Sequence, residues 1–316
     1  MRTVLAGDLG GTKCRFALVA DDFSVHRVQH VPTVRERQPF LDALGAAIRT
    51  ILAELPAGCE PPTAAGFGTA GVIPSSGRSI AVAPNLPLDG FPLADFVEQR
   101  FGLRTTLLND GRASAFGEYL RGHAAGQDPL LCLFFGTGIG IGLIAGGAPF
   151  GGASNAAGEI GHTTFRPGGR RCPCGGLGHF EAYCGGRAIT ELAAERCGPA
   201  PAKASWTVGA VVAAAAAPGP AQAAAQAILA DAELAATTLV ANACTLLNPA
   251  AVVLGGGVLS GWPALGASIE RHVRATTTAP IHQDLRFVPT LGGSDAILWG
   301  AAAATGVLWQ QRSGGA

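Results

Sequence analysis

Two histidines and two cysteines lie close together in a glycine-rich part of the sequence. The run GEIGH at 158–162 is followed by Cys172 and Cys174, separated by one residue, and then by His179. Thiolates and imidazoles are ligands that tetrahedral zinc prefers. Buried free cysteines are the alternative, but the glycines and arginines around them are not typical of a core. The pattern therefore indicates a zinc site.

Two acidic residues flank this cluster, with Glu159 before it and Glu181 after it. Carboxylates in such positions either bind hydroxyl groups of a substrate or orient the metal ligands through hydrogen bonds. The residues alone leave both roles open.

Two glycine-rich turns are candidates for binding phosphate. They have the sequences DLGGTK at 8–13 and GTGIG at 136–140. Glycines let backbone N–H groups approach phosphate oxygens, and Lys13 adds a positive charge. A plain hairpin turn would explain either one alone, but two such turns in one chain favour the phosphate interpretation. Neither turn is a Walker loop or a dinucleotide-binding fingerprint.

An apolar stretch ends in Asn109 and Asp110, directly before a predicted helix. Asp110 is then either the N-cap of that helix or a carboxylate that accepts a proton from a substrate hydroxyl. The ordinary pKa of an aspartate, about 3.9, keeps it ionised at neutral pH. The spacing does not decide between the two roles.

Short apolar runs predict the elements that carry these residues. Strands are expected at 3–7, 15–20, 27–31, 65–67 and 105–108, and helices at about 39–55, at 93–101 and from about 112. The opening pattern of apolar run, glycine turn and apolar run returns at 130–147, which indicates an internal duplication. Two α/β lobes with their glycine turns facing across a cleft would follow. Further strands with glycine turns are expected at 252–257 and 291–296.

The bulk composition narrows the class of protein. The 316 residues include 22 basic and 22 acidic ones, so no basic surface for nucleic acid or anionic lipid is expected. The mean hydropathy of +0.31 comes largely from alanine, and Pro218 and Pro220 interrupt the alanine-rich stretch short of the roughly 20 apolar residues of a bilayer crossing. The early Asp8 argues against a signal peptide, and clustered cysteines favour metal over disulfides. We expect a cytoplasmic protein.

The motifs GDLGGTK, NDGRASAFGE, FGTGIG, GEIGH, CPCGGLGHFE and VVLGGGV resemble, in this order, those of the ROK family of sugar kinases and repressors, from residue 3 to about residue 305. The resemblance implies an α/β fold of the two-lobed, actin-like ATPase (ribonuclease H-like) type, with an internal duplication and a central cleft. We expect a small lobe at 1–115 and a large lobe with the zinc loop at 116–294. The C-terminal helix, about 295–312, is expected to pack back on the small lobe.

The resemblance also implies roles for individual residues. ATP phosphates would lie between the two glycine turns, with magnesium near Asp8, and Asp110 would be the catalytic base. The implied ATP-binding residues are Asp8, Gly10, Gly11, Thr12, Lys13, Gly136, Thr137, Gly138, Gly255, Gly256 and Gly257. The implied sugar-binding residues are Asn85, Asn109, Asp110, Glu159, His162 and Glu181.

The chain departs from the family pattern at two positions. His179 stands where the family has the third cysteine of CxCGxxGCxE, and Arg112 stands where it has the last asparagine of NDxN. Histidine is itself a good zinc ligand. We therefore expect a structural zinc held by His162, Cys172, Cys174 and His179, with loss of the metal, or Cys184 as the replacing ligand, as the alternatives. Arg112 follows Asp110 on the helix and leaves the base unchanged.

The family resemblance implies a homodimeric kinase that phosphorylates a hexose. The motifs do not decide which sugar it is, and conversion of glucose to glucose 6-phosphate is our first expectation. Fructose, N-acetylmannosamine and N-acetylglucosamine are the alternative substrates. A sugar-responsive repressor would need a DNA-binding domain, and GGTK already begins at residue 10. An ATPase acting on phosphate or a small acid would have no need of the GEIGH and CPC motifs.

Overall fold

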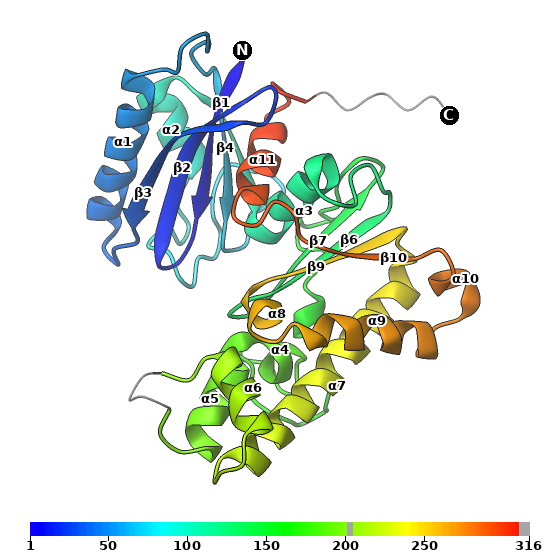
Figure 1. Cartoon of the computed structure of the whole chain (residues 1–316). Helices are drawn as coiled ribbons and strands as arrows, with labels where there is room; N and C mark the ends of the chain where they lie inside the picture. The colour runs from blue at the N-terminus through cyan, green and yellow to red at the C-terminus, as the bar shows by residue number, and fades with distance from the viewer. Residues whose placement is uncertain (201–204, 310–316) are drawn as a thin grey trace. The chain divides into compact units, whose positions relative to one another are not determined.

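The computed structural model describes residues 1–200 and 205–309, which divide into two compact units. Unit 1 contains residues 1–127, 142–158 and the chain from Leu291 onward, and unit 2 contains residues 128–141 and 159–290. The chain therefore passes between the units four times. Figure 1 shows the elements of both.

Unit 1 is built on a mixed sheet of five strands in the order β3-β2-β1-β4-β5. The strands are β1 (Thr3–Leu9), β2 (Lys13–Ala20), β3 (Val25–Pro32), β4 (Ala64–Thr69) and β5 (Arg104–Asn109). β1 pairs antiparallel with β2 and parallel with β4, and β4 pairs parallel with β5. All five strands expected in this region are confirmed.

Helices cover both faces of this sheet, and its central strand β1 is buried along almost its whole length. The helices are α1 (Arg37–Ala53), α2 (Leu93–Phe101), α3 (Asp110–Arg121) and α11 (Ala296–Ala303). Leu5 and Leu9 of β1 belong to one core with α1 and α2. Val4 and Ala6 belong to a second core with α3 and α11. The pleat of a strand turns successive side chains to opposite faces, so β1 contributes to both cores.

α3 and α11 approach each other closely through glycines. A Cβ at Gly117 would lie 2.0 Å from the carbonyl oxygen of Ala296, and one at Gly300 would lie 1.8 Å from that of Ala113. Only a residue without a side chain fits at such a distance. α11 ends at Ala303, short of the expected 295–312, and residues 310–312 lie outside the described residues.

Unit 2 contains most of a second sheet, whose order is β10-β9-β6-β7-β8. The strands are β6 (Leu130–Phe135), β7 (Ile139–Ala145), β8 (Ala148–Pro149), β9 (Ala251–Gly255) and β10 (Arg286–Pro289). The boundary between the units falls within β7, and β6, β9 and β10 are parallel. The helical segments of unit 2 are η1 (Ile160–His162), α4 (Glu181–Cys184), α5 (Gly186–Arg196), α6 (Val208–Ala216), α7 (Gln222–Leu247), α8 (Gly257–Gly261), α9 (Ala264–Thr276) and α10 (Ala279–His282).

By length and composition, α7 passes as a possible membrane span within the described part of the chain. This corrects our expectation that no segment would do so, because the helix begins after Pro218 and Pro220 and continues to Leu247. In the structure 61% of its most apolar window is buried, and residues such as Ile228 and Leu239 belong to the core of unit 2. α7 is therefore accounted for as a core helix.

Candidate functional site

The parallel strands of unit 1 bring two candidate carboxylates to one edge of the sheet. Leu9 at the end of β1 pairs with Thr69 of β4, which pairs in turn with Asn109 of β5. Asp8 precedes Leu9 and Asp110 follows Asn109, so both lie at the carboxyl end of the parallel strands. This edge is where open α/β sheets commonly bind ligands.

Asn109, and not Asp110, is the N-cap of α3. Its side-chain oxygen accepts hydrogen bonds from the backbone N–H groups of Gly111 at 3.0 Å and Arg112 at 3.3 Å, and its amide donates to the carbonyl of Gly71 at 3.3 Å. Asp110 is the first residue of the helix, and its carboxylate accepts from the N–H of Gly111 at 2.8 Å. The N-cap role left open for Asp110 is therefore wrong.

Both carboxyl groups have raised pKa values, mainly because they are buried. Burial, together with the negative charge of Asp110, raises the pKa of Asp8 to about 6, and Arg15 and Lys13 lower it only in part. Burial also raises the pKa of Asp110, against the hydrogen bond from Gly111. Paired acids with raised pKa values are typical of sites that hold a cation or take up a proton.

The first glycine turn joins β1 to β2 and lies against Asn85. A Cβ at Gly11 would lie only 2.6 Å from the Cβ of Asn85. The carbonyl of Gly10 accepts a hydrogen bond from the hydroxyl of Thr33 at 2.6 Å, whereas Thr12 and Lys13 are exposed. The turn thus has a fixed backbone and a free positive side chain beside the residues expected to bind substrate.

The second glycine turn is held by hydrogen bonds within unit 2. The carbonyl groups of Gly136 and Thr137 accept from the N–H groups of Gly186 and Arg187, at 2.9 and 3.0 Å. A carboxylate oxygen of Glu181 accepts from the N–H of Ile139 at 2.9 Å. Glu181 therefore lies directly against this turn, a contact that sequence reasoning did not anticipate.

The third glycine stretch, Gly255–Gly257, lies next to this second turn. Phe134 of β6 pairs with Gly255 of β9, so the turns that follow the two parallel strands leave the same edge of the sheet. Gly256 has φ of 99°, and a Cβ there would lie 2.4 Å from the carbonyl oxygen of Phe135. The structure thus brings together the two expected ATP-binding segments of unit 2.

The four expected zinc ligands form one cluster in unit 2. Ligand atoms of His162, Cys172, Cys174 and His179 all lie within 4.8 Å of one another. Nδ1 of His162 is 3.5 Å from Sγ of Cys172, and Nδ1 of His179 is 3.2 Å from Sγ of Cys174.

The cluster fits a tetrahedral zinc ion. Zinc–nitrogen bonds of about 2.0–2.1 Å and zinc–sulfur bonds of about 2.3 Å place the two donor atoms roughly 3.5 Å apart. Burial raises the pKa of the Cys172 thiol to about 11, so a stable thiolate there requires a cation beside it. Cys184, the alternative ligand, is buried and its thiol donates to the carbonyl of Phe180.

Glu159 and Glu181 lie beside this cluster. A carboxylate oxygen of Glu159 is 3.9 Å from Nε2 of His162, whose other ring nitrogen faces Cys172. A carboxylate oxygen of Glu181 is 4.0 Å from Sγ of Cys172. A metal at the cluster would therefore fix His162, which lies beside Glu159, and Cys172, which lies beside Glu181.

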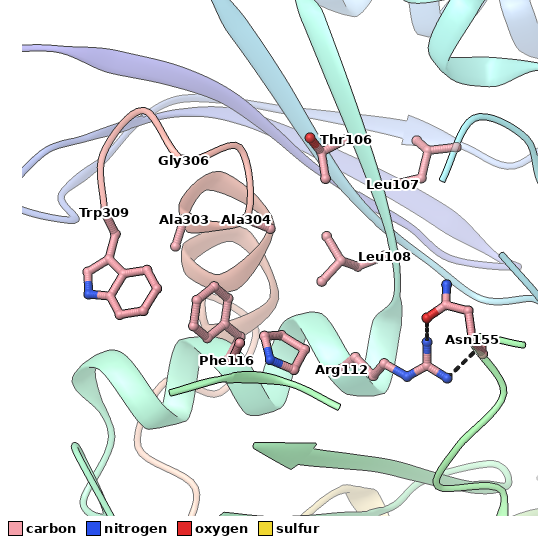
Figure 2. Close-up of a pocket in the computed structure, with 12 residues that line it drawn as sticks. Thr106, Leu107, Leu108, Arg112, Phe116, Asn155, Ala303, Ala304, Gly306 and Trp309 are labelled. Carbon is pink, nitrogen blue, oxygen red and sulfur yellow. Dashed lines mark hydrogen bonds between the residues drawn. The ribbon is translucent and has the colours of Figure 1, made fainter. Parts of the chain in front are cut away.

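A cavity of about 510 Å³ lies elsewhere in unit 1, between β5, α3, β8 and the chain after α11 (Figure 2). None of the residues expected to bind ATP, sugar or metal lines it. Leu108, Phe116 and Trp309 give it an apolar wall, and Arg112 and Asn155 close one side. This cavity is therefore not the site that the sequence predicts for ATP, sugar or metal.

Sequence reasoning did not predict that two charged residues of α3 are buried. Arg112 is 5% exposed, and Glu118 is fully buried with its carboxylate accepting from the N–H groups of Leu291 and Gly292 at 2.9–3.1 Å. Charged residues are seldom fully buried without partners. Their partners are distant in sequence, so only their place within the NDGRASAFGE motif could have drawn attention to them.

The structure is thus that of an α/β protein with two mixed five-stranded sheets and a cluster of two histidines and two cysteines. The model of the ROK family matches residues 4–307, and the chain belongs to the ROK family.

Relatives with known names include two kinds of kinase. The chain is 32% identical over 204 residues to a glucokinase of Streptomyces coelicolor, covering 65% of this chain and 63% of the relative. It is 34% identical over 196 residues to an N-acetylmannosamine kinase of Citrobacter koseri, covering 60% and 64%. The matched region thus spans less than two thirds of the length of each of these two relatives.

Solved structures match over nearly the whole chain. A ROK family glucokinase from Streptomyces griseus in complex with glucose and AMPPNP has a TM-score of 0.79 at 28% identity, covering 96% of this chain and 98% of that one. A ROK hexokinase from Thermus thermophilus has a TM-score of 0.77 at 30% identity, covering 95% and 96%. The expected α/β, actin-like fold is confirmed.

Proposed function

We propose that this protein transfers the terminal phosphate of ATP to a hydroxyl of a hexose, with glucose as the first candidate. The observation that carries the proposal is the pair Asp8 and Asp110 at the carboxyl edge of the unit 1 sheet, beside the turn that carries Lys13. Such an edge suits a cation, a phosphate and a hydroxyl that must lose its proton. The likeness to a glucokinase that binds glucose and AMPPNP supports it.

Asp110 is proposed as the base. In phosphoryl transfer the protein mainly orients the attacking hydroxyl and neutralises developing charge. The carboxylate of Asp110 takes up the hydroxyl proton, and its raised pKa makes it a stronger base than an ordinary aspartate. Asp8 would hold magnesium, which neutralises phosphate charge when bound. Lys13 and the N–H groups of the two glycine turns would contact the phosphates.

The remaining expected residues are proposed to bind the sugar. Asn85 and Asn109 belong to unit 1, and Glu159, His162 and Glu181 belong to unit 2. Carboxylates, amides and imidazoles are groups that hydrogen-bond to hydroxyls.

Zinc is proposed to have a structural role, held by His162, Cys172, Cys174 and His179. All four ligand positions are taken by protein side chains, which is typical of structural rather than catalytic zinc. The ion would fix the loop in front of Glu181 and hold the imidazole of His162. The Nε2 of His162 then stays available for a sugar hydroxyl.

A regulator of the same family is the rival function. A ROK family transcriptional regulator has a TM-score of 0.83 to this chain at 24% identity, so the fold alone is shared by both classes. The carboxylate pair and the charged turn favour catalysis. Kinases for fructose, N-acetylmannosamine or N-acetylglucosamine are the alternatives within the same reaction class, and an ATPase acting on phosphate or a small acid is a further rival.

A coupled ADP-release assay over a panel of these sugars, with acetate and polyphosphate as controls, tests the proposal. We expect the highest kcat/KM with glucose. No sugar-dependent ADP release would overturn the kinase proposal, and preference for an N-acetylhexosamine would replace glucose as the substrate. A homodimer and a cytoplasmic location are also proposed, and gel filtration with light scattering would test the former.

A further inference from the structure

Arg112 is a buried arginine whose guanidinium bonds to one loop. It is the third residue of α3 and is 5% exposed. Its Nη1 donates to the side-chain oxygen of Asn155, and its Nη2 donates to the backbone carbonyls of Asn155 at 2.8 Å and Ala157 at 3.2 Å. Figure 2 shows the side chains of Arg112 and Asn155 next to each other at one side of the cavity.

Asn155 connects this arginine to a third segment. Its side-chain amide donates to the carbonyl of Ile73 at 2.9 Å, and its backbone has φ of 59°. Asparagine tolerates this left-handed conformation better than most residues. The N–H of Ala157 donates to the carbonyl of Gly151 at 2.9 Å, which closes the loop 151–157 on itself. The loop is thus tied to α3 and to the chain after β4.

The position of these bonds links them to the proposed site. Asp110 is two residues before Arg112, at the start of the same helix. Glu159 is two residues after Ala157, so no more than about 7 Å separates their Cα atoms along the chain. Gly158 between them has φ of 97°. One guanidinium therefore fixes the loop that leads to Glu159 against the helix that carries the base.

We propose that Arg112 is a positioning residue for sugar binding. Its hydrogen bonds hold the loop 151–157 against α3, and this fixes the start of the segment that carries Glu159 and His162. The inference rests on the proposed function of Glu159 and His162 as sugar-binding residues. Arginine suits the task because its planar fork reaches a side-chain oxygen and two carbonyls at once. Lysine has a single ammonium and cannot reproduce that pattern.

Steady-state kinetics of Arg112→Met and Arg112→Lys test the proposal. We expect Arg112→Met to raise KM for the sugar about 10-fold or more, since small misplacements of binding groups have large effects. KM for ATP should stay within about 2-fold of wild type, because the glycine turns proposed to contact the phosphates lie outside the loop 151–157. Arg112→Lys should give an intermediate KM for the sugar.

Arg121→Met is the matched control. Arg121 is the last residue of α3, where its guanidinium donates to the carbonyl of Asp22 and lies over the rings of Phe23 and Trp299. The same chemical change at the other end of the helix should leave both KM values within about 2-fold. Asn155→Gly removes the partner side chain but accepts a positive φ, so it should reproduce the effect of Arg112→Met even if that variant folds poorly.

Hydrogen exchange of the loop 151–157 gives a readout that needs no activity. We expect faster exchange of the Ala157 amide in Arg112→Met and Asn155→Gly than in wild type or Arg121→Met. Unchanged exchange together with an unchanged KM for the sugar would overturn the clamp. A wild-type protein that phosphorylates no sugar, but whose loop loosens in Arg112→Met, would overturn the proposed function and leave the clamp itself standing.

Discussion

At the start of α3, neighbouring residues carry separate tasks. Asn109 caps the helix with its side-chain oxygen. Asp110 is the next residue, and burial raises the pKa of its carboxyl group, as it does that of Asp8. An aspartate that served as the cap would have its pKa lowered by the helix N–H groups. For Asp110, burial outweighs the hydrogen bonds that lower the pKa, so its pKa is raised.

Asp110→Asn should reduce kcat by roughly 10²–10⁴-fold, because the amide keeps the shape of the side chain but cannot accept the proton. Affinity for the sugar should change by only a few-fold. The measurement is kcat by the coupled assay together with sugar affinity by calorimetry, after a melting curve has shown that the variant folds. A kcat near that of the wild type would remove Asp110 from the role of base.

Asp8→Asn should stabilise the ligand-free protein at alkaline pH. The pKa of Asp8 is raised from 3.8 to about 6 in the folded protein. A carboxyl with a raised pKa favours folding when protonated, and that contribution is lost as the pH rises from about 4 through about 6. Two pKa units correspond to roughly 2.7 kcal/mol, and the partial exposure of Asp8 reduces the expected gain to about 2 kcal/mol.

The test is thermal unfolding of the wild type and Asp8→Asn at pH 4 and pH 8, without magnesium or nucleotide. The variant should melt higher at pH 8, and the two curves should approach each other at pH 4. Equal melting temperatures at pH 8 would show that Asp8 is not destabilised by burial and by Asp110.

At the scale of elements, the zinc loop is shaped around an imidazole. A short antiparallel contact pairs Thr164 with His179, and a Cβ at Gly176 would lie 2.2 Å from the ring of His179. The histidine that replaces the family's usual cysteine thus fits because residue 176 has no side chain. The loop accommodates the longer ligand through a missing Cβ.

Gly176→Ala should therefore displace the ring of His179 and lower zinc affinity by about 10–100-fold, the range seen when metal ligands lose their support. His179→Ala should lose the metal and raise KM for the sugar more than KM for ATP, because Glu181 follows this loop directly. In the double variant Gly176→Ala with His179→Cys, the shorter thiol leaves room for the methyl group and zinc binding should recover.

Zinc content by elemental analysis and affinity by chelator competition are the measurements. Full zinc occupancy in His179→Ala, or a wild-type protein that purifies without zinc, would show that His179 is not a ligand. Gly176→Ala with unchanged affinity would show instead that the ring has another way to move.

Periodicity is sufficient for most elements of unit 1, because local burial patterns determine them. The strand expected at 291–296 is wrong, since β10 ends at Pro289 and residues 291–295 form bends and turns. All five strands of the first sheet, α2 and α3 occupy the expected stretches, and the four zinc ligands lie within one segment of 18 residues. The contacts of Arg112 and Glu118 could not be predicted, since their partners are 43 to 174 residues away. The sequence does not decide between Asn109 and Asp110 as the cap, because asparagine and aspartate cap helices equally well.

At the scale of the whole molecule, the residues proposed for one reaction are divided between two units. Asp8, Lys13 and Asp110 belong to unit 1, whereas the second glycine turn and Glu181 belong to unit 2. The chain crosses between the units at four places, and α3 holds the chain next to two of them, through Arg112 near Gly158 and through Glu118 at Leu291. A single helix thus stabilises both connections.

Sugar binding should make the protein more compact, because the residues proposed to bind one sugar and one triphosphate are divided between the two units. Closure would also exclude water and so suppress hydrolysis of ATP in place of transfer. Small-angle scattering should show a smaller radius of gyration with saturating sugar than without it. Glu159→Gln at the same sugar concentration is the control, and it should compact less because a contact from unit 2 is weakened. If calorimetry shows that the wild type has bound sugar while its radius stays unchanged, the units do not close on the sugar and the reaction must take place in a site that is already assembled.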